Sequence, residues 1–257
     1  MSELKITILG SGTSVGVPVI GCTCEVCTTQ RPKNIRSRCS LLIEFPTGEK
    51  VVFDTSPDFR QQILTAKVSM IDGVVYTHTH ADHLHGLDDL RAFWFHSKKP
   101  VKCWISPVHL DDLKSRFSYV FNDTGYPGSP PQVDLSLIDN DFNLFGVPIE
   151  TFQLPHGPGT TTAFRIGSFV YATDFQYFPE EIKNKLKGQI HTMIASGVGW
   201  EPHKTHSSVT ETTQLFKDLE VQRGIVHHLA HTVDYYQHTL DSPYEFAYDQ
   251  QQLTAPI

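Results

Sequence analysis

The chain has 257 residues, of which 39% are hydrophobic and 19% charged, and its formal net charge is −7. This length allows one sizeable hydrophobic core and is short for two, so we expect a single domain over residues 1–257. The acidic excess argues against nucleic acid as a partner, because nucleic-acid-binding proteins usually present a broad basic face.

Short β-branched runs alternate with weaker helical patterns along the chain. The runs that predict strands are 5–9, 40–45, 50–55, 72–77, 102–106, 147–154, 162–167, 168–174 and 224–229. Helical periodicity falls in 58–66, 87–95, 108–117, 180–187 and 209–220. Strands with interspersed helices are typical of a layered α/β or α+β domain. We find no export signal and no run of about 18 apolar residues, which predicts a cytoplasmic protein without membrane contact.

The segment FNDTGYPGSPPQVD, within residues 118–136, interrupts this alternation. Its glycines and prolines favour turns over a helix or a strand, so we expect a long loop. Long loops in compact domains commonly carry function. A lid over a site and a plain solvent-exposed connector are equally compatible with this one.

Three of the five cysteines, Cys22, Cys24 and Cys27, fall within six residues of one another. Such close spacing does not suit a disulfide framework, and reduced thiols in the cytosol favour a metal ion. A reduced cluster without a metal is the alternative. Cys39 and Cys103 are expected to be ordinary buried thiols.

The stretch THTHADHLHG stands where the predicted strand 72–77 ends. His78 and His80 are two residues apart, which places both imidazoles on one side of an extended backbone, and Asp82 and His83 follow as the chain turns. Imidazole and carboxylate groups suit zinc, iron or manganese. Four of them in one small volume therefore predict a site for one or two divalent ions, with a polar, histidine-rich turn as the alternative.

Further ligand-type residues follow other predicted strands. His156 ends QLPH, Asp174 ends FVYATD, and GIVHHLAH supplies His227, His228 and His231. An isolated Asp or His after a strand is more often a turn or capping residue than a ligand. Their recurrence within one chain favours the metal interpretation.

In this order, HTHADH, LPHG, YATD and VHHLAH resemble the metallo-β-lactamase superfamily, and the resemblance spans residues 6–231. It implies a four-layer αβ/βα sandwich with a dinuclear metal centre at one edge. The stretches GSGTSVGVP, GCTCEVC, FDTSPDFR and PHKTHSSV also resemble the PhnP-like phosphodiesterases, which open phosphoribosyl cyclic phosphate in phosphonate breakdown.

The resemblance implies a set of ligands for each metal ion. One ion would be held by His78, His80 and His156, the other by Asp82, His83 and His228, and Asp174 would bridge the two. Zinc, manganese or iron would suit these ligands. His228 is preferred to His227 because adjacent strand residues point to opposite faces, so only one of the two easily faces the metals.

The resemblance also implies a partner for the clustered cysteines. In the similar phosphodiesterases, a histidine three residues after the catalytic ligand completes a closed tetrahedral zinc site. The corresponding ligands of a structural zinc ion here are Cys22, Cys24, Cys27 and His231. Such a site would tie the N-terminal segment to the last predicted strand.

Catalysis by this arrangement needs a proton for the departing oxygen. His206 matches the general acid of the similar phosphodiesterases, and a free imidazole titrates near neutral pH. Together with the ligand Asp82 it makes the expected catalytic pair. The nearby His203 is expected to be exposed, with a role in supporting a site residue as the alternative. Asp54 either orients a metal-binding histidine or caps a turn, and the sequence favours neither.

The function that follows is hydrolysis of a small cyclic phosphodiester, such as phosphoribosyl cyclic phosphate, by a hydroxide shared between two metal ions. The partner would be a small phosphorylated metabolite. A homodimer is also compatible with the sequence, because related enzymes are often dimers. Another hydrolase of this superfamily is one alternative, with a lactone, a thioester, a β-lactam or the 3′ end of transfer RNA as substrate. A non-hydrolytic cofactor-binding relative is the other.

Overall fold

The computed structural model describes residues 3–122, 129–138 and 141–257. Within these residues, one sheet has seven strands, and the first strand of the chain is second in its order. In spatial order, its strands are β14 (Gln251–Pro256), β1 (Glu3–Gly10), β2 (Ser40–Glu44), β3 (Lys50–Phe53), β4 (Gly73–Val75), β5 (Val101–Ile105) and β6 (Val133–Leu137). Pairings are antiparallel from β14 to β3 and parallel from β3 to β6.

The second sheet repeats this division into a parallel and an antiparallel half. Its strands are, in spatial order, β13 (Tyr244–Phe246), β12 (Arg223–His227), β11 (Thr192–Ser196), β10 (Phe169–Ala172), β9 (Gly159–Ile166), β8 (Val147–His156) and β7 (Phe142–Leu144). Pairings are parallel from β13 to β10 and antiparallel from β10 to β7. Every residue of β10 and β11 is buried, because these central strands are covered on both faces.

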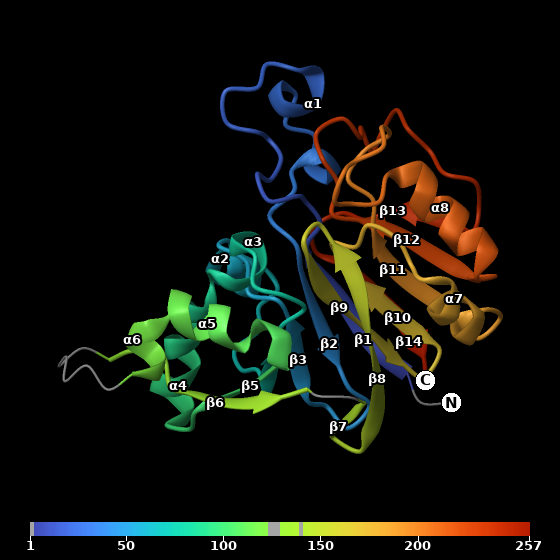
Figure 1. Ribbon diagram of the computed structural model, residues 1–257. Helices are drawn as coiled ribbons and strands as arrows, with labels where there is room; N and C mark the ends of the chain where they lie inside the picture. The colour runs from blue at the N-terminus through green and yellow to red at the C-terminus, as the bar shows by residue number, and fades with distance from the viewer. Residues whose placement is uncertain (1–2, 123–128, 139–140) are drawn as a thin grey trace.

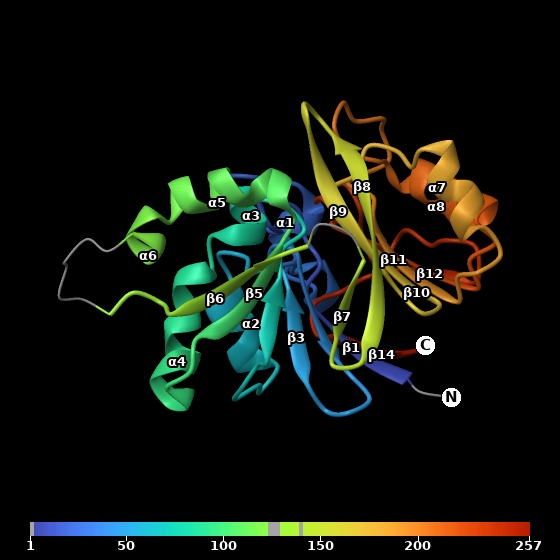
Figure 2. The same ribbon diagram turned by 60° about the horizontal axis from the view of Figure 1, so that its bottom comes forward.

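Helices flank the two sheets on their outer sides. The α-helices are α1 (Glu25–Thr28), α2 (Phe59–Thr65), α3 (Ala81–Leu84), α4 (Arg91–Ser97), α5 (Leu110–Arg116), α6 (Ser118–Phe121), α7 (Glu180–Leu186) and α8 (Val209–Asp218). Short 3₁₀ helices are η1 (Pro32–Asn34), η2 (Leu87–Leu90) and η3 (Pro107–His109). Helices α2 to α6 lie beside the first sheet and α7 and α8 beside the second (Figure 1 and Figure 2). The order helix, sheet, sheet, helix confirms the predicted four-layer sandwich.

Three clusters of buried apolar side chains hold these layers together. Between the sheets, the ring of Phe53 lies edge-on against Phe164 and Tyr171, with ring centroids 5.2 and 5.8 Å apart. Burial of each such aromatic ring stabilises the fold by roughly 1.5–3 kcal/mol. The other two clusters join each sheet to its own helices, as where Phe216 of α8 lies under the second sheet.

Helix α8 begins at a capping box. The Ser208 side chain accepts a hydrogen bond from the Glu211 backbone N–H (3.2 Å), and the Glu211 carboxylate accepts one from the Ser208 N–H (2.8 Å). At ten residues it is the longest helix in the described ranges, about half of what a membrane span requires. In this part of the chain no helix could cross a bilayer.

Several short strands were not predicted from the sequence. They are β6, β7, β11, β13 and β14. Strand β14, for example, alternates buried and exposed residues but contains two glutamines and a proline, and it is held by antiparallel pairing with β1 at the other end of the chain. The prediction of a loop over 118–136 was also wrong at both ends, because α6 and β6 occupy them. Residues 123–128 of this segment, which was interpreted as either a lid or a plain connector, lie outside the described residues.

Candidate metal centres

The seven side chains expected to bind metal ions converge at one end of the two sheets. Two groups of ligand-type atoms, each lying within 4.8 Å of one another, share Asp174. The first group contains His78, His80, His156 and Asp174, and the second contains Asp82, His83, Asp174 and His228. All of these side chains are buried except that of His80, which is exposed.

Two of these ligands belong to a very short helix. Strand β4 ends at Val75, earlier than predicted, so His78 and His80 lie in the loop that follows it and their rings are 4.6 Å apart. The chain then turns into the four-residue helix α3, which carries Asp82 and His83. This turn places four ligand-type groups around one small volume, as the motif predicts.

Three residues that come shortly after buried strands have left-handed backbone geometry. The φ angles of Asp54, Asp174 and His228 are 67°, 54° and 58°. Such a conformation costs a residue other than glycine about 1–3 kcal/mol, and the surrounding fold must supply that energy. Each turn directs a side chain back towards the cluster, and residues under this strain are concentrated at functional sites.

The carboxylate of Asp174 contacts both groups. Its Oδ2 lies 3.7 Å from His78 Nε2 and 3.9 Å from His156 Nε2 in the first group, and 3.3 Å from His83 Nε2 in the second. Its Oδ1 lies 3.1 Å from His228 Nε2. This is the position that a ligand shared by two cations would occupy.

Hydrogen bonds at the outer nitrogens orient the imidazole rings. Asp54 Oδ2 accepts from His83 Nδ1 (2.7 Å) and from the Thr77 hydroxyl (2.8 Å). Because the Thr77 proton is used in this way, His78 Nδ1 donates to the Thr77 oxygen (2.9 Å). In each ring the lone pair of Nε2 is left facing the cluster. Asp54 therefore orients a candidate ligand, which decides between the two roles expected for it.

His156 is oriented by a main-chain group. Its Nδ1 donates to the Thr205 carbonyl oxygen (2.9 Å), and its Nε2 lies 3.1 Å from His80 Nδ1. Sequence reasoning did not single out Thr77 or Thr205, because a hydroxyl and a main-chain carbonyl carry no recognisable pattern. It also passed over His109, which is buried with its ring centroid 6.5 Å from that of His78.

The charges of the cluster favour a bound cation. Burial alone would lower the pKa of His83, but the carboxylates of Asp174, Asp82 and Asp54 raise it well above its ordinary value. Burial would raise the pKa of Asp174, but the imidazoles of His228 and His83 hold it well below its usual range. A positive charge is therefore stabilised between these carboxylates, and a divalent cation could supply it in place of a proton.

Several inward-facing atoms lack a hydrogen-bond partner among the described residues. They are His78 Nε2, Asp82 Oδ2, His83 Nε2 and His228 Nε2, all buried. Unpaired buried polar atoms are costly, and metal coordination is one way to satisfy them. Nitrogen and carboxylate donors in this arrangement fit two ions such as zinc, manganese or iron.

His227 and His228 point in different directions, as expected. His227 donates from Nε2 to the Gly10 carbonyl oxygen (3.1 Å) and contacts the Cys39 sulfur (3.3 Å), away from the cluster. The expected cause was the alternation of side chains along a strand. In the structure β12 ends at His227, and the left-handed backbone at His228 turns the His228 side chain towards the cluster. His228 lies among the candidate ligands and His227 does not.

His206 lies beside the cluster, in the loop that precedes α8. Its ring stacks on that of His228 with centroids 5.5 Å and planes 17° apart, and its Nδ1 is 3.9 Å from Asp174 Oδ2. Burial lowers the pKa of His206 to about 4, below the neutral value assumed from the sequence. The ring is therefore neutral near pH 7 until another negative charge approaches it. His203, 5.0 Å from His206 between ring centroids, is exposed as expected.

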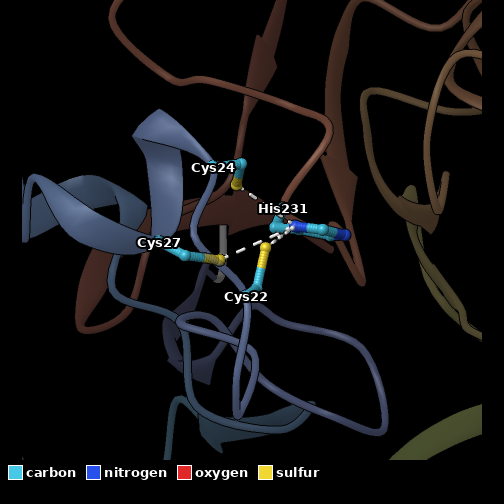
Figure 3. Close-up of side chains that lie close together, drawn as sticks. All are labelled: Cys22, Cys24, Cys27 and His231. Carbon is cyan, nitrogen blue, oxygen red and sulfur yellow. Dashed lines mark hydrogen bonds between the residues drawn. The ribbon is translucent and has the colours of Figure 1, made fainter.

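A third group of candidate metal ligands joins the N-terminal arm that carries α1, which projects beyond the sheets (Figure 1), to His231 in the segment after β12. The sulfur atoms of Cys22, Cys24 and Cys27 lie 3.2, 3.4 and 3.6 Å from His231 Nδ1 (Figure 3). Zinc bonds of about 2.3 Å to sulfur and 2.0 Å to nitrogen in a tetrahedron give ligand separations of about 3.5 Å. The four residues therefore fit one zinc ion. Cys39 and Cys103 are buried elsewhere, as predicted.

The zinc interpretation of the arm is tested by Cys22→Ser. We expect the zinc content of the purified protein to fall by one ion per chain and Tm to drop by on the order of 10 °C, because a structural ion contributes to folding. Elemental analysis and a thermal melt measure both. Cys103→Ser is the matched control, since this buried thiol lies in a strand of the first sheet. Equal zinc in the two variants would contradict the assignment.

Asp54→Asn tests the orientation of His83. We expect the affinity for metal at the second group to fall about 10- to 100-fold, the usual effect of removing a carboxylate that orients a ligand. Competition with a chromogenic chelator measures this change. The control is Asp218→Asn, an exposed carboxylate at the end of α8. Unchanged affinity in Asp54→Asn would show that the hydrogen bond has no part in metal binding.

Comparison with known proteins decides the family. The profile of the Beta-lactamase superfamily domain matches residues 49–229, which include all seven candidate ligands of the two adjoining groups. The chain belongs to the beta-lactamase superfamily. This confirms the family that the histidine and aspartate motifs indicated.

One curated protein is similar to most of this chain. The chain is 32% identical over 241 residues to a protein of Porphyromonas gingivalis named octanoyltransferase, a match that covers 93% of this chain and 48% of that protein. The chain thus spans about half the length of this curated relative.

Two solved structures share the fold over the whole chain. A crystal structure described as a new diphosphatase from the PhnP family is 31% identical, with a TM-score of 0.90 over 99% of this chain and 98% of that one. Zinc-bound PqqB from Methylobacterium extorquens is 18% identical, with a TM-score of 0.77 over 98% and 100% of the two chains. The first of these is consistent with the PhnP-like resemblance of the motifs.

Proposed function

We propose that this protein is a metal-dependent phosphodiesterase that hydrolyses a small cyclic phosphodiester, such as phosphoribosyl cyclic phosphate. The observation that carries the proposal is the position of Asp174, whose Oδ2 lies within 3.9 Å of imidazole nitrogens from both ligand groups and of His206 Nδ1. A site for two adjacent cations with an imidazole beside it suits phosphoryl transfer. The likeness to a diphosphatase of the PhnP family supports a phosphorus substrate.

The two ligand groups would hold one divalent ion each, with Asp174 between them. Such a pair supplies positive charge for the phosphate oxygens and lowers the pKa of a water molecule. Burial alone would raise the pKa of Asp82, but His83 and His228 hold it below its usual range, so that its carboxylate stays ionised. Asp82 Oδ2 faces the nitrogens of His83 and His228 in the second group, so it would bind the metal ion there, and the other carboxylate oxygen would be left to orient the attacking water.

His206 is placed to protonate the leaving oxygen. Its Nδ1 faces the cluster, is buried and has no hydrogen-bond partner in the described part of the chain. A phosphodiester anion bound against this ring would raise its pKa again and keep a proton at Nδ1. Transfer of that proton to the departing alkoxide would avoid a charged leaving group.

A substrate panel tests the proposal. With metals loaded, we expect turnover of bis(p-nitrophenyl) phosphate and of a ribose cyclic phosphate. Turnover of a lactone, a thioester or a transfer-RNA precursor, with both phosphodiesters untouched, would reject a phosphodiesterase in favour of another hydrolase. A thioester is included in the panel because the similar protein of Porphyromonas gingivalis is named octanoyltransferase.

Metal content separates the enzyme from a non-hydrolytic relative. Two ions at the adjoining groups together with one zinc ion on Cys22, Cys24, Cys27 and His231 would agree with an enzyme. Zinc at the cysteines alone would favour a cofactor-binding protein. Elemental analysis of the wild type beside Cys22→Ser assigns the ions to their sites.

A further inference from the structure

A cavity of about 360 Å³ lies beside His206, the proposed general acid, and none of the candidate metal ligands lines it. Its walls include Val198, Trp200, Glu201, His203 and Ala230. This volume is within the range of small-molecule sites. The residues come from the loops after β11 and β12, the same sheet edge that carries the metal groups.

A row of imidazoles connects the cavity to the metal cluster. The ring of His228, a candidate ligand, stacks on His206, and His206 lies 5.0 Å from the ring of His203 in the cavity wall. The two loops that form the wall are joined by a hydrogen bond from the Ala230 N–H to the Val198 carbonyl oxygen (2.8 Å). A general acid must touch the leaving oxygen. The group attached to this oxygen would therefore be directed towards the cavity.

Trp200 gives the cavity a rigid flat wall. Its indole is half-buried and packs edge-on against His238 and Phe246, with ring centroids 5.0 and 6.0 Å apart. These contacts hold the ring in place before any ligand arrives, which lowers the entropic cost of binding. Val198 and Ala230 add apolar surface beside it.

The lining is mostly apolar, and Glu201 and His203 add groups that suit a ligand carrying hydroxyls. A carboxylate such as that of Glu201 accepts hydrogen bonds from hydroxyl groups. His203 Nδ1 accepts from the Thr205 N–H (3.3 Å), so its Nε2 carries the proton and can donate. A flat aromatic wall with one acceptor and one donor is the chemistry that binds a sugar ring, whose apolar face stacks and whose hydroxyls form hydrogen bonds.

We propose that this cavity is the leaving-group subsite and that it binds a sugar ring, stacked on Trp200 and hydrogen-bonded to Glu201 and His203. The proposal rests on the proposed function and assigns the residues that would bind the sugar of its substrate. Because the ring stays bound throughout the reaction, the subsite contributes equally to the ground and transition states. Its loss should therefore raise KM and leave kcat nearly unchanged.

Trp200→Ala tests the subsite with two matched substrates. A ribose cyclic phosphate and ethylene phosphate share a five-membered cyclic phosphodiester, but only the first carries a sugar. We expect KM for the ribose compound to rise about tenfold with kcat within a factor of about two, and both constants for ethylene phosphate to stay unchanged. Trp94→Ala is the control, because Trp94 is a half-buried tryptophan on α4. Glu201→Gln should raise KM for the ribose compound by a smaller factor.

Other outcomes would overturn the subsite without touching the proposed function. Equal losses for both substrates, or no loss for either, would mean that Trp200 does not bind the sugar. A loss confined to bis(p-nitrophenyl) phosphate would assign the cavity to aryl groups. Binding of free D-ribose, followed by saturation-transfer NMR, is independent of turnover. It should be seen in the wild type and in Trp94→Ala and be lost in Trp200→Ala, and its absence from the wild type would reject the proposal whatever the protein hydrolyses.

Discussion

Asp174→Asn is expected to reduce phosphodiesterase activity at least about a thousandfold, with loss of one or both ions from the adjoining groups. The carboxylate is the one candidate ligand in the described residues that contacts both groups, and it provides charge that offsets the repulsion between two cations. Asparagine keeps the shape of the side chain and tolerates the left-handed backbone at φ 54°, so the change removes charge without adding strain.

The measurement combines turnover with metal content per chain. Zinc at Cys22, Cys24, Cys27 and His231 should be retained. Its presence would show that the N-terminal arm of the variant is still folded. Asp218→Asn serves as the control for loss of a single carboxylate, because that side chain is exposed at the end of α8. Two ions and full activity in Asp174→Asn would remove the central argument for a dinuclear centre.

His206→Ala is expected to lower kcat by about 10²- to 10⁴-fold while both metal groups keep their ions. The ring stacks on His228 but is not needed to complete either ligand group. The loss should also depend on the leaving group. A p-nitrophenolate departs without help, so the effect on bis(p-nitrophenyl) phosphate should be much smaller than that on a ribose cyclic phosphate, whose alkoxide requires a proton.

A pair of assays distinguishes this role from a structural one. His96→Ala, an exposed histidine on α4, controls for the loss of an imidazole. Equal losses on the two substrates would indicate that His206 acts on binding or folding. Loss of metal from His206→Ala would place the residue among the ligands and contradict its assignment as an acid.

The local motif alone predicted much of the metal site. In THTHADH, four ligand-type residues are close in sequence, so almost any turn after a buried strand brings them together, and the structure does so through the short helix α3. His156, Asp174 and His228 are different. Each lies at or just after the end of a strand of the second sheet, and only their order and the resemblance to a known family indicated that they belong with the motif.

Features that depend on contacts between distant segments could not be predicted. The orientation of His156 relies on the Thr205 carbonyl, 49 residues away, and that of His83 on Asp54 and Thr77. Strands such as β14 and β11 have weak patterns of their own and exist because neighbours in the sheet supply their hydrogen bonds. The pKa of His206 likewise differs from that of a free imidazole because of burial, which no neighbour in sequence reveals.

Strand and helix periodicity in the sequence by itself determined the layered fold, and the resemblance of its motifs to a known family indicated the superfamily and the candidate metal-binding side chains. Only the tertiary structure decided which atoms face one another. It placed Asp174 between the two groups, turned His228 inward and His227 outward, and opened a cavity at Trp200 beside His206. The physical reason is that these arrangements depend on left-handed turns and on packing between two sheets, and both are set by contacts across the whole fold.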